Sequence, residues 1–258
     1  MKVNNITKGI ILAGGSGTRL HPLTKVVSKQ LLPIYDQPMI YFPLSILIKA
    51  GIKDIMIIST PQDQSLFQRL LDDGSQWGVS IEYSIQSEPK GIAQAFIISQ
   101  DWLNNSNCIL ILGDNLFFGP SLDQIIKNAV ENNNGGTIFG YKVRDPNRFG
   151  VIEFNTKNEV ISIEEKPELP KSDWIATGLY IYDNKVAERT KTLDFSKRGE
   201  LEITDLNNIY LENKELNVVL LNEDFSWLDT GTHKTLLEAS NFVKKIKDEF
   251  GSKSIGLI

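Results

Sequence analysis

Apolar runs alternate with helical patterns through the first half of the chain, and this alternation constrains the fold more than any other feature. The first run, KGIILAG, is continuous rather than alternating, which indicates a strand buried on both faces. Strand-like runs cover residues 8–14, 54–60, 80–86 and 108–114, and helical patterns cover residues 39–51, 61–74, 91–103 and 121–133. Strand–helix alternation predicts an α/β fold of three layers (αβα), with a Rossmann-like, mostly parallel sheet between helices.

The pattern changes in the second half of the chain. Strand-like runs split by turn residues follow at residues 136–145, 150–155, 159–167 and 174–183. We interpret them as a mixed, partly antiparallel and β-rich lobe beside the parallel strands. Further helices are expected at residues 184–191, 203–213 and 233–251, with short strands at 216–221 and 225–228. No linker interrupts the pattern, so we predict a single domain with two lobes.

Composition excludes several classes of protein. A chain of 258 residues is long enough to bury a sizeable core. No apolar run approaches the ~20 residues of a bilayer span, and the N-terminus lacks the pattern of a secretory signal. The net charge of −5 argues against non-specific nucleic-acid binding. The only cysteine, Cys108, cannot form an internal disulfide, so we expect a cytoplasmic protein.

The turn AGGSGTR directly follows the first strand. A dinucleotide-binding fingerprint would need a third glycine where this chain has Leu20, and no segment fits the G-x-x-x-x-G-K-[ST] pattern of a P-loop. Glycines nevertheless allow several backbone N–H groups to point inward and bind an anion. The alternative is an ordinary strand-to-helix turn, and the turn alone does not decide between the two.

Basic residues near this turn favour phosphate binding. Arg19 follows the glycines directly, and Lys25 and Lys29 are four residues apart. Taken alone, the two lysines are an ordinary solvated pair. Beside the turn, the planar fork of Arg19 and the point charge of Lys29 suit a di- or triphosphate.

Two aspartates end apolar strands. Asp114 closes CILILGD, and Asp229 follows FSWL. Ligands of open α/β sheets lie beyond the carboxyl ends of strands, where a carboxylate is well placed for a metal ion. The alternatives are a turn-capping Asp114 and a helix-capping Asp229. The DTG string also occurs in aspartic proteases, but those enzymes need two such carboxylates on a β fold.

A third charged group ends a strand-like run in SIEEKPELP. Glu164, Glu165 and Lys166 stand there directly before Pro167. The simplest interpretation is a charged hairpin end. The functional interpretation is a lysine for an anionic substrate beside a glutamate for hydroxyl groups.

Taken together and in this order, eight motifs resemble the sugar-1-phosphate nucleotidylyltransferases: LAGGSGTRLHPLT, SKQLLPI, LGDN, FGVIEF, EEKP, TGLYIYD, GELEITD and WLDTGTH. The resemblance spans about residues 8–250, and the most similar members use dTTP and glucose 1-phosphate. It implies transfer of dTMP to the sugar phosphate with release of pyrophosphate, dependent on Mg²⁺, for deoxysugar and surface polysaccharide synthesis. It also implies a homo-oligomer, a dimer or tetramer, with no nucleic-acid or membrane partner.

The resemblance further implies a role for individual residues. The nucleotide would be bound by Gly14, Gly15, Gly17, Thr18, Arg19, Lys29, Gln30, Gln86, Gly91 and Asp114. The sugar phosphate would be bound by Gly150, Glu165, Lys166 and Ala176. Asp114 and Asp229 would hold the metal, and Arg19, Lys166, Asp114 and Asp229 would be catalytic. The implied lobes are about residues 1–140 for the nucleotide and 141–231 for the sugar phosphate, with a C-terminal helix at about 232–250.

The implied chemistry agrees with the scarcity of histidine. The nucleophile is a phosphate oxygen that is already mostly ionised near pH 7, because the second pKa of a phosphate monoester is about 6. The reaction then needs alignment and relief of crowded negative charge rather than a general base. Only His21 and His233 are present in the chain.

The sequence departs from the family pattern at three places. The base loop reads QSEP where relatives often have QPSP, Phe149 replaces a usual tyrosine, and the chain ends at Ile258 without the C-terminal segment that supports subunit contacts and regulation in longer members. Two alternative functions remain open. One is the same reaction with UTP or another sugar. The other is a non-catalytic sensor of sugar nucleotides, which would be free to lose the charged residues retained here.

Overall fold

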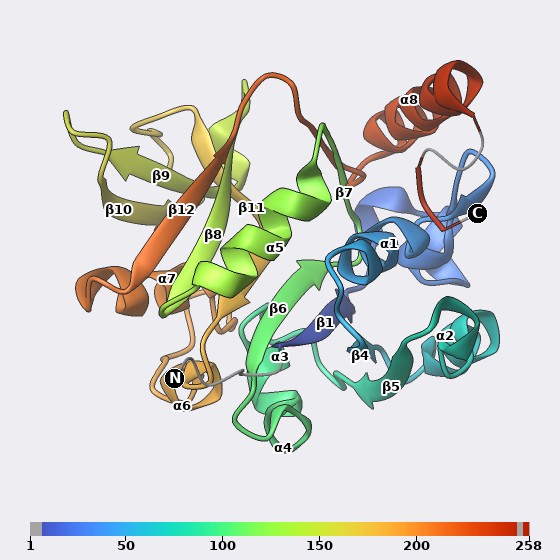
Figure 1. Cartoon of the computed structure of the whole chain (residues 1–258), viewed down its shortest axis with the longest axis horizontal. Helices are drawn as coiled ribbons and strands as arrows, with labels where there is room; N and C mark the ends of the chain where they lie inside the picture. Colours follow the sequence, from blue (N-terminus) through green and yellow to red (C-terminus); the bar gives the residue numbers. More distant parts are fainter. Residues whose placement is uncertain (1–6, 252–254, 258) are drawn as a thin grey trace. The chain divides into compact units, whose positions relative to one another are not determined.

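A computed structural model describes residues 7–251 and 255–257 of the chain (Figure 1). The described residues form two compact units. One comprises residues 7 and 8, Lys90–Leu110 and Ile125–Phe225; the other comprises Gly9–Pro89, Ile111–Gln124 and the described part of Ser226–Ile258. We refer to them as the β-rich unit and the loop unit, and each is described by itself.

The loop unit is built on parallel strands. β1 (Thr7–Ala13) pairs with β4 (Asp54–Ser59), which pairs with β5 (Ser80–Ile85), in both cases in parallel. The end of β6 (Asn107–Leu112) belongs to this unit and continues beside β1, where the Gly113 N–H donates to the Leu12 carbonyl. Helices α1 (Tyr41–Lys49) and α2 (Gln64–Leu71) are the crossover connections between the strands. The carboxyl ends of β1 and β6 therefore lie at one edge of the parallel strands.

Two short strand pairs complete the loop unit. β7 (Asn115–Phe118) pairs antiparallel with β13 (Ser226–Asp229), and β2 (Pro33–Ile34) pairs with β3 (Gln37–Pro38). The last helix, α8 (His233–Phe250), begins with a capping box between Thr232 and Thr235. A cluster of apolar side chains packs α8 against these strands; it consists of Ile34, Met39, Phe42, Leu116, Ala239, Val243 and Ile255.

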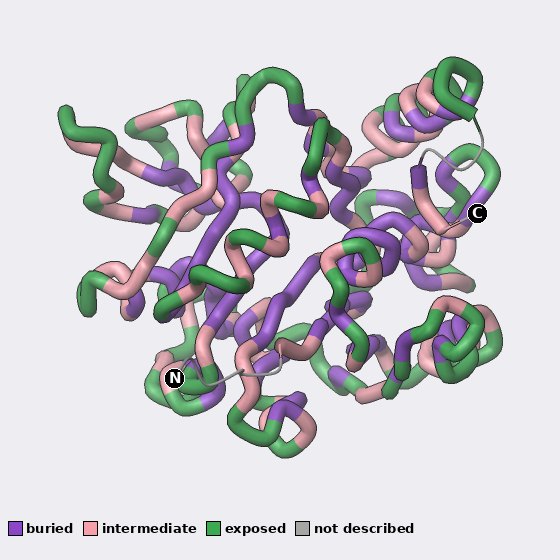
Figure 2. Tube along the Cα trace, viewed as in Figure 1, coloured by how far each residue is buried: buried purple, intermediate pink, exposed green. Residues whose placement is uncertain are grey.

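The β-rich unit is built mainly on antiparallel strands. β11 (Trp174–Tyr182) pairs antiparallel with β8 (Gly136–Lys142) and β9 (Gly150–Phe154), and β9 pairs antiparallel with β10 (Val160–Glu165). β12 (Leu216–Leu221) runs parallel to β8. Buried strand residues form the core of the unit, and Figure 2 shows β8 and β11 as largely buried traces.

The α-helices of the β-rich unit are all shorter than α8. They are α3 (Gln94–Ile98), α4 (Gln100–Leu103), α6 (Val186–Thr190) and α7 (Ile203–Glu212), and α5 (Leu122–Asn132) begins in the loop unit and ends here. The start of β6 also belongs to this unit, and its residue Cys108 is fully buried.

The predicted α/β fold with a mixed sheet is confirmed, and most elements lie within a few residues of their predicted bounds. The helix predicted over residues 91–103 is in fact two short helices, because Ser99 leaves the helical conformation and its hydroxyl donates to the Ala95 carbonyl. β7 and the β2–β3 hairpin were not predicted, because they are too short to show a hydrophobic period. In the described part of the chain, no helix is long and apolar enough to cross a membrane.

Candidate active site

The glycine-rich turn after β1 needs its glycines for two different reasons. Gly15 and Gly17 have φ angles of 99° and 58°, a region that residues with a Cβ rarely adopt. Gly14 instead allows a close approach, because a Cβ there would lie 2.6 Å from Oε1 of Gln86. Thr24 fixes the turn by donating its hydroxyl to the Gly17 carbonyl over 2.7 Å.

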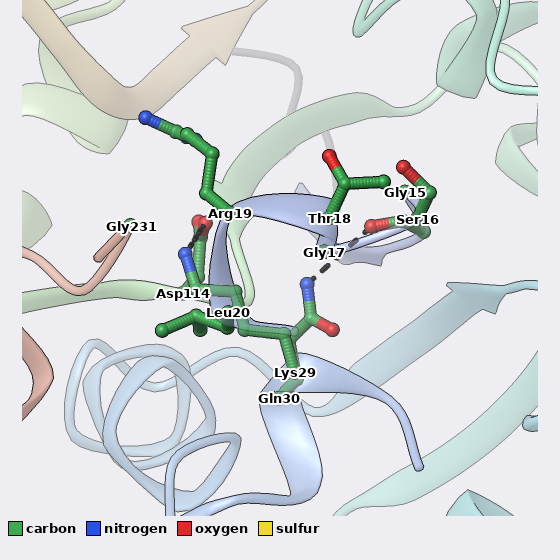
Figure 3. Close-up of a pocket in the computed structure, with 11 residues that line it drawn as sticks. Gly15, Ser16, Gly17, Thr18, Arg19, Leu20, Lys29, Gln30, Asp114 and Gly231 are labelled. Carbon is green, nitrogen blue, oxygen red and sulfur yellow. Dashed lines mark hydrogen bonds and ion pairs between the residues drawn. The ribbon is translucent and has the colours of Figure 1, made fainter. Parts of the chain in front are cut away.

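Lys29 and Asp114 form an ion pair at the same edge of the parallel strands. Lys29 Nζ lies 2.5 Å from Asp114 Oδ2, and the two side chains are only 8% and 23% exposed. Lys29 begins the short 3₁₀ helix Lys29–Leu31, and Asp114 follows β6. Taken alone, Lys29 is expected to be an ordinary solvated lysine; the structure instead buries it and points it at Asp114 (Figure 3).

The charge of Asp114 is maintained despite its burial. Burial by itself would raise the pKa of this carboxyl, but Lys29 and the Asn115 side-chain amide, which donates to Oδ1 over 3.0 Å, hold the pKa below its usual value of 3.8. Asp114 is therefore an ionised carboxylate at neutral pH. A carboxylate of this kind can bind a cation.

The pairing of β7 with β13 brings the second aspartate to this edge. Asp229 is the register partner of Asn115, the residue directly after Asp114. The Thr230 hydroxyl donates to the Asp114 carbonyl over 2.9 Å, which ties the two segments together. Two carboxylates at one strand end fit a hard divalent cation, which takes one or two protein carboxylates and completes its shell with phosphate and water oxygens. The described residues contain no cluster of three or more His, Cys, Asp or Glu side chains that could bind a metal unaided.

A cavity of about 240 Å³ lies over the glycine-rich turn (Figure 3). It is lined by Gly14, Gly15, Ser16, Gly17, Thr18, Arg19, Leu20, Lys29, Gln30, Asp114 and Gly231. The structure thus brings together eight of the residues expected to bind the nucleotide. Ser16, Leu20 and Gly231 were missed, although all three lie inside motifs that the sequence analysis had recognised.

A neighbouring cavity of about 200 Å³ contains the next expected residue, Gln86. It shares Gly15 and Ser16 with the first cavity, and its other lining residues are Thr60, Pro61, Gln62, Ser87 and Pro89. The Gln86 side chain is buried, so its amide is held in a fixed place. Thr60, Pro61 and Gln62, which follow β4, were not predicted as site residues.

The remaining expected residues lie in the β-rich unit. Gly150 begins β9 and is the register partner of Glu165, the last residue of β10. Lys166 follows with a φ of 45°, and its N–H donates to the Phe149 carbonyl. The Lys166 side chain is 44% exposed, and its Nζ lies 3.4 Å from Glu165 Oε1.

Other side chains hold Glu165 in place. The Thr204 hydroxyl donates to Glu165 Oε2 over 2.5 Å, and Arg198 Nη2 lies 3.3 Å from Oε1. Arg198 is itself anchored by Glu202, at 2.7 Å. These partners come from GELEITD and the residue before it, a motif that carried no assigned role in the sequence analysis.

Two expected residues have less distinctive surroundings. Ala176 lies in β11, where it pairs with Gly140 just before the register shifts. Gly91 lies in the β-rich unit, whereas Gln86 lies in the loop unit. A Cβ on Gly91 would be 2.3 Å from the Leu201 carbonyl oxygen, so packing of the backbone against Leu201 explains this glycine.

The loop unit thus presents a glycine-rich turn, a guanidinium, a lysine and the ionised carboxylate of Asp114 around one cavity, whereas Asp229 does not line it. Such a set binds polyphosphate together with a divalent cation. The β-rich unit presents a lysine beside a fixed carboxylate, which suits an anionic ligand that carries hydroxyl groups.

Comparisons with known proteins agree with this chemistry. Residues 8–246 match the family model described as nucleotidyl transferase. The chain is 56% identical to glucose-1-phosphate thymidylyltransferase of Neisseria meningitidis over 93% of its length and 84% of the relative's. It is 52% identical to the protein of the same name from Mycolicibacterium smegmatis, over 95% of this chain and 85% of that one.

Solved structures extend the comparison. A putative glucose-1-phosphate thymidylyltransferase from Bacillus anthracis, solved with sucrose, superposes with a TM-score of 0.85 at 41% identity, covering 92% of this chain and 94% of that one. A UDP-glucose pyrophosphorylase complexed with UDP-glucose has a TM-score of 0.81 at 24% identity, over 93% of this chain and 99% of that one, which shows a common fold alone. The chain belongs to the nucleotidyl transferase family.

Proposed function

We propose that the protein is a glucose-1-phosphate thymidylyltransferase, which transfers dTMP from dTTP to glucose 1-phosphate and releases pyrophosphate. The observation that carries the proposal is the cavity in which Arg19, Lys29 and Asp114 surround a glycine-rich turn. It is supported by relatives of that name that are 46–56% identical to this chain.

On the nucleotide side, the loop unit binds the triphosphate. The backbone N–H groups of the turn and the Lys29 ammonium neutralise its charge, and the Arg19 guanidinium stabilises the pyrophosphate as it leaves. Gly14, Gly15, Gly17 and Thr18 line the phosphates, and Gln30 belongs to the same site.

On the acceptor side, the β-rich unit binds glucose 1-phosphate. Lys166 holds the phosphate whose oxygen attacks the α-phosphorus of dTTP, and Glu165 accepts hydrogen bonds from sugar hydroxyls. Gly150 and Ala176 leave room for the sugar. Because the attacking oxygen is already ionised near neutral pH, the side chains need only align the reactants in line and offset their charge.

Asp114 and Asp229 are the residues that would hold a divalent cation, and we propose Mg²⁺. The cation would offset the negative charge that accumulates around the α-phosphoryl group. Asp229 pairs with Asn115, the residue that follows Asp114 in the sequence, and Asp114 is ionised, which supports this assignment.

We propose that Gln86 recognises the base through its buried amide, with Gly91 shaping the following loop. Thymine and uracil differ by one methyl group, which is worth only about 1–3 kcal/mol in a pocket. Partial activity with UTP is therefore expected.

We further propose a homo-oligomeric, cytoplasmic enzyme whose product supplies deoxysugar synthesis for surface polysaccharide. The single cysteine, Cys108, is fully buried, which agrees with a reducing compartment. Light scattering after size-exclusion chromatography measures the oligomeric state directly.

The test is release of pyrophosphate from dTTP or UTP, with glucose 1-phosphate and Mg²⁺. We expect release with both nucleotides and higher kcat/KM with dTTP. No release from either nucleotide would refute the enzymatic function. A clear preference for UTP would refute only the assignment of the base.

A further inference from the structure

We infer that Gly231 is a positioning residue for Arg19: its missing side chain lets the guanidinium lie where phosphate is bound. The inference rests on the proposed function of Arg19 and adds a residue to the site. Gly231 is buried and lines the cavity together with Arg19 (Figure 3).

The space beside Gly231 is filled by the guanidinium. A Cβ built on Gly231 would lie 3.0 Å from Arg19 Nη2 and 3.1 Å from both Cζ and Nη1. These nearly equal distances mean that the flat guanidinium group lies across the position that a Cβ would occupy, rather than approaching it with one atom. Any side chain at residue 231 would have to displace it.

Backbone conformation does not explain this glycine. Gly15 and Gly17 have positive φ angles, whereas the φ of Gly231 is outside the left-handed region. An alanine could therefore adopt the same backbone conformation without strain. The close approach of Arg19 is the feature that requires a glycine.

The backbone around Gly231 is fixed, whereas the guanidinium is not. Thr230 is fully buried and hydrogen bonded to the Asp114 carbonyl, and the Thr232 side chain caps α8. Arg19 is exposed, and within residues 7–251 and 255–257 no hydrogen bond or ion pair restrains its guanidinium. A Cβ at residue 231 would therefore move Arg19 rather than the backbone.

A side chain at residue 231 would change the orientation of the Arg19 guanidinium rather than the stability of the fold. An unpaired guanidinium offers all its N–H donors to a phosphate ligand, and its usefulness depends on where the planar fork points. Catalytic groups must be held within about 0.5 Å of the productive position. Contact distances of 3.0–3.1 Å require a shift of a few tenths of an ångström at least.

The experiment is a double-mutant cycle with Gly231→Ala, Arg19→Ala and both together. The probes are pyrophosphate affinity by calorimetry and kcat with dTTP. We expect Gly231→Ala to weaken pyrophosphate binding and to lower kcat by about tenfold each, with little change in the KM for glucose 1-phosphate, since one charge-assisted contact is misplaced. In the Arg19→Ala background, Gly231→Ala should have no further effect. Thermal unfolding checks that each variant is folded.

A second measurement reports the position of the Arg19 side chain independently of its role in phosphate binding. The NMR shift of the Arg19 side-chain Nε–H should change in Gly231→Ala without any ligand. An unchanged chemical shift together with wild-type pyrophosphate affinity would overturn the inference. The inference would also fail if Gly231→Ala lowered kcat by the same factor in the Arg19→Ala background as in the wild type. If the shift changes but Arg19→Ala binds pyrophosphate normally, Gly231 does position Arg19, and it is the proposed phosphate-binding role of Arg19 that fails.

Discussion

The two lysine–carboxylate pairs that we propose bind the two substrates differ in the burial of their lysines. Lys29 and Asp114 are 8% and 23% exposed and 2.5 Å apart, whereas Lys166 and Glu165 are 44% and 23% exposed and 3.4 Å apart. A buried pair contributes to the fold as well as to the chemistry, because removing one partner leaves an uncompensated charge. A pair whose lysine is exposed to water contributes little to stability, and such a lysine can reach a ligand. The difference predicts different consequences of mutation in the two units.

The largest expected effect concerns the aspartates of the loop unit. Asp229→Asn should lower Mg²⁺-dependent turnover by about 10²–10³-fold, the usual cost of losing one preorganised electrostatic contact. The fold should survive, because asparagine can still accept a hydrogen bond. Pyrophosphate release and thermal unfolding measure the two properties. Full activity would reduce Asp229 to a structural residue before α8.

The two lysines give the sharpest comparison. Lys29→Gln should lower both turnover, by about 10²-fold, and the free energy of unfolding, by about 3 kcal/mol, because Asp114 loses its partner. Lys166→Gln should lower turnover by a similar factor but change stability by less than about 1 kcal/mol. Urea unfolding measured beside activity separates the two outcomes.

Lys25→Gln is a matched control, since Lys25 is exposed and four residues from Lys29. Equal stability losses for Lys29 and Lys166 would contradict the distinction drawn between the pairs.

A smaller effect is expected at the support of Glu165. Thr204→Val removes the hydroxyl that donates to Glu165 Oε2 and keeps the volume of the side chain. The KM for glucose 1-phosphate should rise by about tenfold, the value of one hydrogen bond to a charged group, with less change in kcat. Thr204→Ser should restore most of the loss. A KM that does not respond to either substitution would show that Glu165 needs no fixed orientation.

The smallest effect is a dependence of stability on pH. The pKa of Asp114 is lowered in the folded protein, so its stabilising contribution is present above the unfolded pKa and is lost as pH falls through the folded value. The stability difference between wild type and Asp114→Asn should therefore be constant above about pH 5 and shrink below about pH 4. Urea unfolding across this range tests the sign. A difference that grows as pH falls would mean that the carboxyl has a raised pKa.

Sequence patterns predicted the parts of the molecule that local physics determines. The continuous run of β1 and the glycines of the following turn were evident because hydrophobic periodicity and positive φ angles leave a trace in residue choice. The ordered motifs then pointed to eight of the residues that line the cavity. Gly231 was not predicted, since its role depends on a side chain more than two hundred residues away in the sequence.

Burial and partners were the properties that sequence could not supply. From sequence alone, Lys29 could be a solvated lysine, and only the fold shows that β6 places Asp114 beside it. Thr204 supports Glu165 across 39 positions of sequence, and no local pattern encodes that contact. The short strand β7 has too few residues to show a period, yet its pairing with β13 places Asp229 opposite Asn115, the residue that follows Asp114.

The burial of Cys108 has a practical consequence. Burial raises the pKa of its thiol, so the reactive thiolate does not form at neutral pH, and the side chain is fully enclosed. The native chain is therefore a clean background for maleimide chemistry. One cysteine introduced at an exposed position of the loop unit and one in the β-rich unit would carry spin labels or fluorophores without removal of any native residue.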